Sequence, residues 1–360
     1  MPTIRQVAEV ANVSPATASR ALGDAHKRLQ VSPATVIRVQ DAARRLGYRV
    51  NYHMRAVSTG RANVTGFAPE VRLDQQVGSG SGNDYFDALR RGVEFTTQEA
   101  GMALMSIHPG RGLTALQRGT QYMQERRLDA LVVPGSTAVH QSTAMFEDDP
   151  SLPLVVVNPL GQINRPRIMF NFPVAMQLIV EHLKSLGHRH VLWFGPNVGI
   201  SGGPSVRQQM FIDAAWHAGL QGTTHLAAVS NVGPTATTII DGVRHSLGEC
   251  LSRSERQWTA IATYNDQWAV GACAALRAAG LDVPGDVSVI GLDNLIATYC
   301  IPGLTTVDHG FYEMGRKAGL LAARLAAADR AERVELCDHC EIVEPKLIVR
   351  DSTGPAPAVA

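Results

Sequence analysis

The chain has 360 residues, of which 45% are hydrophobic and 18% charged, and its formal net charge is +1. This length predicts two or three domains, and the composition excludes a disordered protein, which would be poor in apolar residues and strongly charged. There is no run of about 18 apolar residues and no apolar signal core near the N-terminus, so we expect neither a membrane span nor secretion. The five cysteines are too sparse for a disulfide framework, which favours a reducing, cytoplasmic compartment.

Positive charge is concentrated at the start of the chain. Residues 1–61 hold ten lysines and arginines against three acidic residues, a net charge of +7, so by difference the remainder carries −6. A basic segment on an acidic body is typical of a protein in which that segment alone binds a polyanion such as nucleic acid. A solvated basic face is the alternative.

Residues 1–50 have the pattern of three short helices. Thr3 with Gln6 forms a capping-box pattern, and Ser14-Pro15 and Ser32-Pro33 each combine a capping serine with a proline in the first helical turn. Gly47 is placed to end the third helix. The first two helices, separated by a turn of three residues, are typical of a helix-turn-helix.

The second helix is short and carries small side chains, which would let it enter a major groove. Its polar groups can then contact base edges or phosphates, namely Thr17, Ser19 and Arg20. A small helical bundle with no role on DNA is the alternative, and the charge excess and the two Ser-Pro caps argue against it.

These residues resemble the head of the lactose-repressor/galactose-repressor family of transcription regulators. The likeness covers about residues 2–353 and rests in the head on residues 3–8, 11–14 and 17–22, on Leu46-Gly47-Tyr48 and on Asn51. The resemblance implies that operator DNA is contacted by Thr3, Ser14, Pro15, Ala16, Thr17, Ser19, Arg20, Ser32, Thr35 and Asn51. Pro15 and Ala16 cannot form bidentate hydrogen bonds to a base, so readout there would be apolar or indirect.

Residues 51–62 match the hinge helix and linker of that family. The resemblance implies that the hinge folds on operator DNA and that Val57 wedges into the minor groove. Met54 shares a helical face with Val57, so we expect the two to wedge together. A plain linker is the alternative for this stretch.

The rest of the chain alternates strand-like and helical runs. Apolar strand-like runs lie at residues 64–68, 103–107, 130–133 and 154–157, and a second series lies at 191–194, 226–229, 260–263 and 287–290. This alternation predicts an α/β fold with doubly wound parallel sheets. Two series predict two lobes, with a ligand bound at the carboxyl ends of the strands.

The resemblance implies a two-lobed, periplasmic-binding-protein-like (type I) core that the chain crosses three times. We expect a helix-turn-helix domain at 1–50, the hinge at 51–62, a ligand-binding and dimerisation core at 63–353 and a disordered tail at 354–360. Lobe 1 is expected at about 63–162 plus 295–324, and lobe 2 at about 163–294 plus 325–353. The crossings are expected near 160–164, 292–296 and 322–327.

Polar pairs follow two strands of the second series, Asn265-Asp266 and Asp293-Asn294. Such pairs suit a ligand site, and a helix cap is an equal alternative. The resemblance implies that the effector is contacted by Tyr85, Phe86, Arg207, Asn265 and Asp293, with Asn158 and Phe311 carried by position alone. An arginine opposite a carboxylate, with aromatic flanks, suits a sugar-like polyol.

Three short motifs resemble functional signatures but do not indicate a functional site. Residues 199–203 fit G-x-S-x-G, but prolines on either side indicate a loop and not a nucleophile elbow. Residues 78–82 are glycine-rich but follow no strand, and Cys337 with Cys340 is a single pair that cannot close a zinc site. The histidines around Leu186-Gly187 are expected on the surface, namely His182, His188 and His190.

The sequence therefore predicts a homodimeric transcription regulator, a repressor, that binds double-stranded operator DNA in the cytoplasm at the nucleoid. A sugar-like effector between the lobes would control its DNA affinity, and no membrane is involved. No catalytic residue, cofactor or metal site is predicted. The alternative is a cytoplasmic small-molecule-binding protein without sequence-specific DNA binding.

Overall fold

The computed structural model describes residues 2–23, 30–49, 56, 59–69, 84–110, 112–135, 149–159, 161, 163–196, 205–227, 236–253 and 256–357. The chain divides into two units, Met1–Asn63, called the head below, and Val64–Ala360, called the body. Each unit has a hydrophobic core of its own. Within the described ranges, no helix is long and apolar enough to cross a bilayer.

The head is built from helices whose ends match the sequence signals. The capping box at Thr3 and the serine caps at Ser14 and Ser32 are confirmed, because each side chain accepts a hydrogen bond from the backbone N–H three residues later. Gly47 ends the third helix with a φ of 64°, a conformation that favours glycine. The helices are α1 (Ile4–Val10), α2 (Pro15–Ala21) and α4 (Pro33–Leu46).

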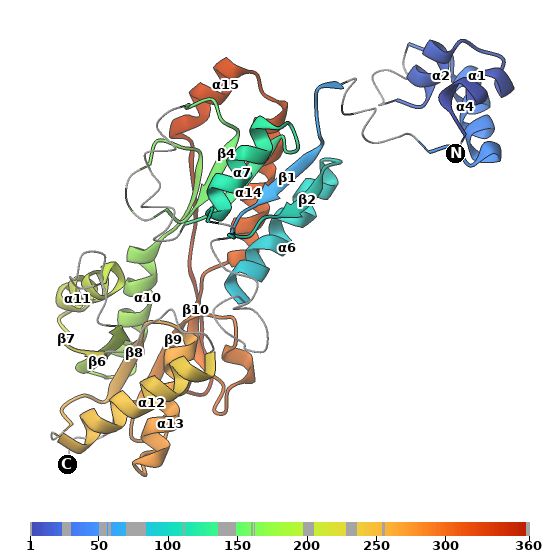
Figure 1. Ribbon diagram of the computed structural model, residues 1–360. Coiled ribbons are helices and arrows are strands. Elements are labelled where there is room, and N and C mark those ends of the chain that lie inside the picture. The colour runs from blue at the N-terminus through green and yellow to red at the C-terminus, as the bar shows by residue number, and fades with distance from the viewer. Residues whose placement is uncertain are drawn as a thin grey trace. The chain divides into compact units, whose positions relative to one another are not determined.

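The body contains two mostly parallel sheets, which confirms the predicted α/β fold (Figure 1). The lobe 1 sheet has the order β11-β5-β4-β3-β1-β2, and the lobe 2 sheet the order β12-β10-β9-β8-β6-β7. The lobe 1 strands are β1 (Val64–Phe67), β2 (Ala103–Ser106), β3 (Ala130–Pro134), β4 (Leu154–Val157), β5 (Arg167–Phe170) and β11 (Cys340–Val343). The lobe 2 strands are β6 (His190–Pro196), β7 (Gln221–Ala227), β8 (Ala260–Thr263), β9 (Ser288–Asp293), β10 (Thr305–Asp308) and β12 (Lys346–Ile348).

Helices cover both faces of the lobe 1 sheet. Ala130 and Val132 join the core formed with α6 and α14, whereas Leu131 between them borders Gly119 of α7 on the other face. This alternation is what a strand buried on both faces requires. The helices of lobe 1 are α6 (Asp84–Glu99), α7 (Ala115–Gln124), α14 (Phe311–Ala327), α15 (Arg330–Glu335) and the 3-10 turn η4 (Leu336–Asp338).

Helices also cover both faces of the lobe 2 sheet. Val191 and Trp193 of β6 pack in the cluster that contains Phe211 of α11, whereas Leu192 and Phe194 pack in the cluster of α12 and α13. Alternate residues of one strand therefore belong to two separate clusters. The helices of lobe 2 are α10 (Phe172–Ser185), α11 (Val206–Ala218), α12 (Ala236–Arg253), α13 (Asp266–Ala278) and the 3-10 turn η3 (Ala297–Tyr299).

The predicted crossings between the lobes are wrong. They lie at Asn171 between β5 and α10, at His309-Gly310 between β10 and α14, and at Glu344-Pro345 between β11 and β12, not near 160–164, 292–296 and 322–327. Strand pairing is the reason: β5 pairs with β4 and β11 and so stays in lobe 1, whereas β10 pairs with β9 and stays in lobe 2. Residues 163–170 and 325–343 therefore belong to lobe 1, and residues 295–308 to lobe 2.

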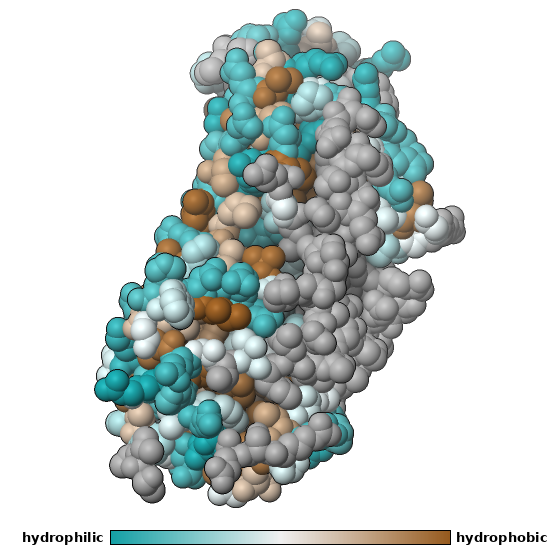
Figure 2. Space-filling view, turned by 90° about the vertical axis from the view of Figure 1, so that its left-hand side faces the viewer, coloured by the Kyte–Doolittle hydropathy of each residue, from teal (hydrophilic) through white to brown (hydrophobic). Residues whose placement is uncertain are grey.

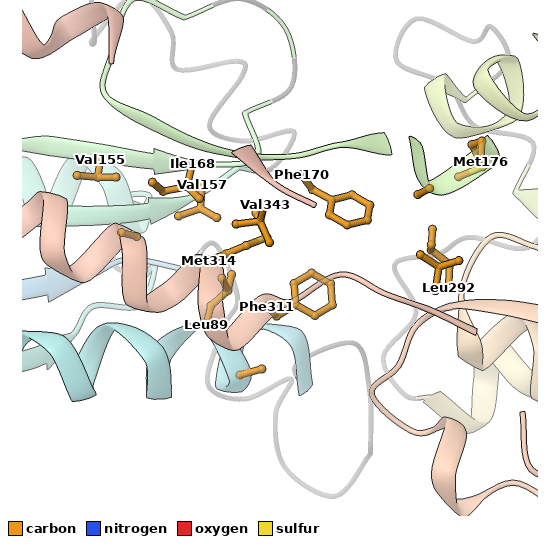
Figure 3. Close-up of a cluster of buried hydrophobic side chains, with 14 of the residues drawn as sticks. Leu89, Val155, Val157, Ile168, Phe170, Met176, Leu292, Phe311, Met314 and Val343 are labelled. Carbon is orange, nitrogen blue, oxygen red and sulfur yellow. The ribbon is translucent and has the colours of Figure 1, made fainter. Parts of the chain in front are cut away.

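The crossings are bonded to one another. The backbone N–H of Asn171 donates to the carbonyl oxygen of Val343 at 3.2 Å, and its Nδ2 donates to Oε2 of Glu344 at 3.0 Å. Figure 3 shows Phe170 and Phe311 between side chains of lobe 1, such as Met314, and side chains of lobe 2, such as Leu292, and all four belong to one buried cluster. The core is thus continuous through the crossings.

The expected disorder of residues 354–360 is contradicted for residues 354–357. This stretch is part of the C-terminal strap, residues 351–357, in which Ser352 is fully buried and donates from Oγ to the carbonyl oxygen of Val289 at 2.6 Å. The backbone N–H of Gly354 donates to Ser288 Oγ, and that of Ala356 donates to Leu186 O. The Pro- and Ala-rich composition suggested disorder, but these backbone groups find partners on lobe 2.

Candidate operator and effector sites

One face of α2 is free in the head for contact with DNA. Pro15, Ala16, Ser19 and Arg20 are exposed, and Thr17 is half-buried at the edge. The opposite face of the helix is buried through Ala18 and Ala21. All the exposed side chains except Arg20 are small, so α2 can approach a groove closely while Arg20 reaches further.

Five of the proposed operator contacts also take part in hydrogen bonds at helix ends. Ser14 Oγ and Thr17 Oγ1 lie 2.9 Å apart, and Ser32 Oγ donates to Thr35 Oγ1 at 2.9 Å. Thr3 likewise caps α1, with Gln6 Oε1 accepting from its backbone N–H at 2.8 Å. Asn51, Met54 and Val57 lie outside the described residues.

Aromatic side chains from lobe 1 gather near the crossings. The rings of Tyr85 and Phe86, in the first turn of α6, lie 4.0 Å apart, and the ring of Phe311, which begins α14, lies 5.3 Å from that of Tyr85. Burial raises the pKa of Tyr85 strongly, with Arg207 opposing this and Asp293 adding to it. The Tyr85 hydroxyl thus stays neutral and lies within electrostatic range of both charged residues from lobe 2.

Arg207 is held in place by two aromatic rings of lobe 2. Its guanidinium carbon lies 4.4 Å from the ring centre of Tyr264 and 5.0 Å from that of Phe172. Nη1 donates to the carbonyl oxygen of Tyr264 at 2.9 Å, and Ser205 caps the helix that carries Arg207. Cation–π contacts and a fixed hydrogen bond preorganise the guanidinium for a polar ligand.

Asp293 and Asn294 form a strained turn at the end of β9. Their φ angles are 121° and 56°, which L-residues rarely adopt and which occur preferentially at functional sites. Hydrogen bonds hold this turn: Asn294 Nδ2 donates to Asp308 Oδ2 at 3.0 Å, and Arg350 Nη2 donates to Asn294 Oδ1 at 2.9 Å. The Asp293 carboxylate itself stays free of this network.

His309 is part of this site and was missed in the sequence. It is fully buried in the second crossing, and its Nδ1 lies 3.0 Å from Oδ1 of Asp293. Its ring also stacks on Phe311, with the ring centres 4.6 Å apart. The signal available in the sequence was its place directly after residues 305–308, but that run is too short and too polar to indicate a strand.

Asn265 and Asn158 have structural roles. Asn265 Oδ1 accepts from the backbone N–H of Trp268 at 3.1 Å and so caps α13, which is the alternative considered for this position. Asn158 Oδ1 accepts from the backbone N–H of Phe170 at 2.7 Å, and its Nδ2 faces the sulfur of Met314 at 3.9 Å. Both carboxamides therefore already have partners in the protein.

Asp266 lies beneath the Asp293 turn and is almost completely buried. Its carboxylate accepts hydrogen bonds from Thr306 Oγ1 at 2.6 Å and from the backbone N–H of Leu295 at 3.0 Å. Burial, followed by the charge of Asp293, raises the pKa of Asp266 to about 7. The site thus combines one carboxylate available to a ligand with a second carboxyl group that titrates near neutrality.

Two other features lie apart from this cluster. A groove of about 450 Å³ runs between α10 and α11, with Met210 and Glu181 among its lining residues, and includes none of the proposed effector residues. Figure 2 shows apolar residues on that side of the body in small groups among hydrophilic ones.

The Cys337 thiol is buried and donates to the carbonyl oxygen of Pro150 at 3.2 Å, and Cys340 is exposed. Among the described residues, no cluster of His, Cys, Asp or Glu could hold a metal.

Comparison with known proteins places both units in one class, that of DNA-binding regulators with a ligand-binding core. The family model of bacterial regulatory proteins of the lacI family matches residues 3–51, and that of a periplasmic binding protein-like domain matches residues 180–353. The HTH-type transcriptional regulator GalR of Escherichia coli K12 is 30% identical over 98% of this chain and 96% of its own length. The HTH-type transcriptional repressor PurR of Aliivibrio fischeri MJ11 is 26% identical over 98% of both chains.

This chain belongs to the lacI family of transcriptional regulators, whose partners are operator DNA and a small-molecule effector, and it is not an enzyme. Solved structures have the same fold. The lac repressor dimer bound to operator and the anti-inducer ONPF matches with a TM-score of 0.73 at 21% identity, covering 98% of this chain and 99% of that one. A complex of the transcriptional regulator CelR with cellobiose matches with a TM-score of 0.60 at 22% identity, covering 98% and 100%.

Proposed function

We propose that this chain is a homodimeric repressor whose affinity for operator DNA is controlled by a sugar-like effector bound where the two lobes meet. One observation carries the proposal: Arg207, held by two aromatic rings, and the carboxylate of Asp293, which faces His309, both act electrostatically on the Tyr85 hydroxyl. This set offers donors and acceptors for hydroxyl groups and aromatic faces for a sugar ring.

Relatives support the effector class. Structures of similar fold contain cellobiose, ribose and lactose. A panel of mono- and disaccharides, screened by the shift in melting temperature of the full chain, tests this proposal. We expect one sugar to stabilise the wild-type chain, and to do so less in Arg207→Lys and Asp293→Asn. Gln209→Ala, on an exposed position of the same helix as Arg207, is the matched control and should respond as the wild type does. A nucleoside or an amino acid as the single stabilising ligand would overturn the sugar assignment.

The experiment that tests operator recognition is selection of binding sites from random duplex DNA by the full-length protein at two salt concentrations. We expect a two-fold symmetric motif of about 14–20 base pairs, because two heads of a dimer read two half-sites about one helical turn apart. The salt dependence reports the number of phosphates contacted. If no motif emerges, the selection is repeated in the presence of each sugar. DNA binding without a motif in those selections as well would contradict the proposal and favour a small-molecule-binding protein without sequence-specific DNA binding.

An exposed apolar pair in lobe 2 supports the dimer. Tyr299 and Ile301 are each 86% exposed, and large apolar side chains so exposed mark interfaces when they adjoin. We expect Tyr299→Glu with Ile301→Glu to shift the protein toward monomer in sedimentation velocity. Trp216→Glu, at another lobe 2 position that is 80% exposed, should leave the sedimentation unchanged. An unchanged dimer in the double variant would exclude this surface.

A further inference from the structure

One histidine contacts both lobes where the chain crosses between them. The ring of His309 stacks between the rings of Phe170, at 3.9 Å between centres, and Phe311, at 4.6 Å. Phe172 closes a third side, edge-on at 5.3 Å. On the remaining side, Nδ1 lies 3.0 Å from Oδ1 of Asp293.

These contacts belong to different lobes. Phe170 ends β5 and Phe311 begins α14, so both move with lobe 1, whereas Asp293 ends β9 of lobe 2. His309 follows β10, which pairs with β9 through Asp308 and Asp293. A change in the angle between the lobes cannot preserve both the ring stack and the contact with the carboxylate. The contacts of His309 therefore depend on the angle between the two lobes.

The contact between His309 and Asp293 is close but not a well-aligned hydrogen bond. Among the described residues, both ring nitrogens of His309 and Oδ1 of Asp293 have no hydrogen-bond partner. Burial holds the pKa of His309 below its usual value, and the charge of Arg207 acts in the same direction, while Asp293 and Asp308 oppose them. The buried ring is therefore neutral at neutral pH, and it gains a proton more readily once the lobes part and water reaches it.

We propose that His309 is a positioning residue that couples the effector site to the angle between the lobes. The neutral ring holds the phenylalanines of lobe 1 against the Asp293 turn of lobe 2. An effector that engages Asp293 competes with this contact. A proton on the ring disfavours the closed arrangement, because the cost of burying the charge between the phenylalanines exceeds its attraction to Asp293. The effector part of the inference rests on the proposed function, because Asp293 is the proposed effector contact.

The test is hydrogen exchange of the full-length chain, without DNA or sugar, at pH 5.5 and pH 7.5, followed by mass spectrometry and corrected for intrinsic exchange rates. The amides of Phe170, Asn171 and Gly310 report on the crossings, because each donates a hydrogen bond there. If the ring regains its ordinary pKa of about 6.5 on opening, these amides exchange about ten-fold faster at pH 5.5 than at pH 7.5. Equal exchange at the two pH values would overturn the inference.

Variants separate this role from a merely structural one. His309→Phe keeps an aromatic ring for the stack and His309→Gln keeps a polar group toward Asp293, and neither titrates, so both should lose the ten-fold pH response. His188→Gln is the matched control, because His188 is also buried with a lowered pKa but bonds to Thr259 and Ser288 within lobe 2. It should keep the wild-type response at the crossings. Retention of the response in both His309 variants would contradict the proposal.

Coupling to the effector site has its own readout. Asp293→Asn should speed exchange of the same crossing amides at pH 7.5, since it removes the charge that faces the ring; unchanged exchange would confine His309 to a local packing role. These measurements need neither an operator nor an identified sugar. A failed DNA selection or sugar panel would thus count against the proposed function alone, and a failed exchange experiment against this inference alone.

Discussion

The Thr306 hydroxyl donates a 2.6 Å hydrogen bond to the buried carboxyl group of Asp266. This bond joins β10, which leads into the second crossing, to the first residue of α13, directly under the Asp293 turn. The bond and the backbone N–H of Leu295 favour the carboxylate, but burial and the charge of Asp293 outweigh them. A carboxyl group in this position makes the stability of the ligand-binding lobe depend on pH.

We expect Asp266 to lower stability as the pH rises. Its pKa is about 7 in the folded chain against 3.8 for an unperturbed aspartate, so between these values the folded state binds the proton more tightly and the free energy of unfolding falls with increasing pH. Denaturant unfolding of the wild type and of Asp266→Asn at pH 5.5 and pH 8 checks this. The wild type should lose about 2 kcal/mol relative to the variant over that range. Asp213→Asn, at an exposed position, should follow the wild type; a wild-type slope in Asp266→Asn would contradict the assignment.

The contact between α6 and α14 depends on glycine. A methyl group on Gly315 would lie 2.1 Å from the carbonyl oxygen of Leu89, and backbone cannot move as a side-chain end does. We expect Gly315→Ala to cost about 3 kcal/mol, at the upper end for overpacking. Gly248→Ala in α12, where a methyl group meets nothing within 4 Å, should be neutral or stabilising by about 0.5–1 kcal/mol. Thermal unfolding compares the two, and similar melting temperatures would argue against this close packing.

The C-terminal strap is expected to stabilise lobe 2. The strap is residues 351–357, and its anchors are Ser352, which bonds to Val289 and to the backbone N–H of Thr305, and Gly354, which bonds to Ser288. A chain that stops after Arg350 loses these bonds and leaves buried partners unpaired, at about 1–3 kcal/mol for each such group. We expect a melting temperature several degrees lower for it and no change for a chain that stops after Pro357. Equal melting temperatures would mean that the strap contributes nothing.

The cap of α2 links head stability to DNA binding. Ser14 Oγ accepts from the backbone N–H of Thr17 at 3.1 Å, and loss of such a cap costs about 1 kcal/mol. Ser14→Ala should therefore weaken binding of the selected operator duplex and lower the melting temperature of the head. Ser19→Ala, exposed on the same helix and not a cap, should leave the melting temperature unchanged and affect the duplex only through a direct contact. Equal melting of the wild type and Ser14→Ala would exclude a stabilising cap.

The sequence patterns of helix caps and apolar runs predicted the helix ends and the buried strands correctly. The caps at Thr3, Ser14 and Ser32 and the end of α4 at Gly47 follow from interactions within a few residues, so they can be read along the chain. The buried central strands are equally evident, because β3, β4 and β8 are continuous apolar runs.

Long-range pairing could not be predicted from the sequence in four places. β5 and β10 are short and partly polar, so only their hydrogen bonds to β4 and β9 show which lobe each belongs to. His188 was expected on the surface, yet it is fully buried because Thr259, Ser288 and Gly354, distant along the chain, supply its partners. Residues 354–357 are ordered for the same reason.

The sequence by itself determined the family, the helix-turn-helix with its caps and the α/β class, because composition, spacing and capping act over short distances. Only the tertiary structure decided where the lobes join, that Asn265 and Asn158 serve backbone groups, and that His309 sits between Phe170, Phe311 and Asp293. Asn265 and Asn158 bond to backbone groups nearby in the chain, whereas the stack of Phe170 on His309 joins segments more than a hundred residues apart at a crossing. Contact between such segments is selected by burial and strand pairing in three dimensions, which leave no periodic trace along the chain.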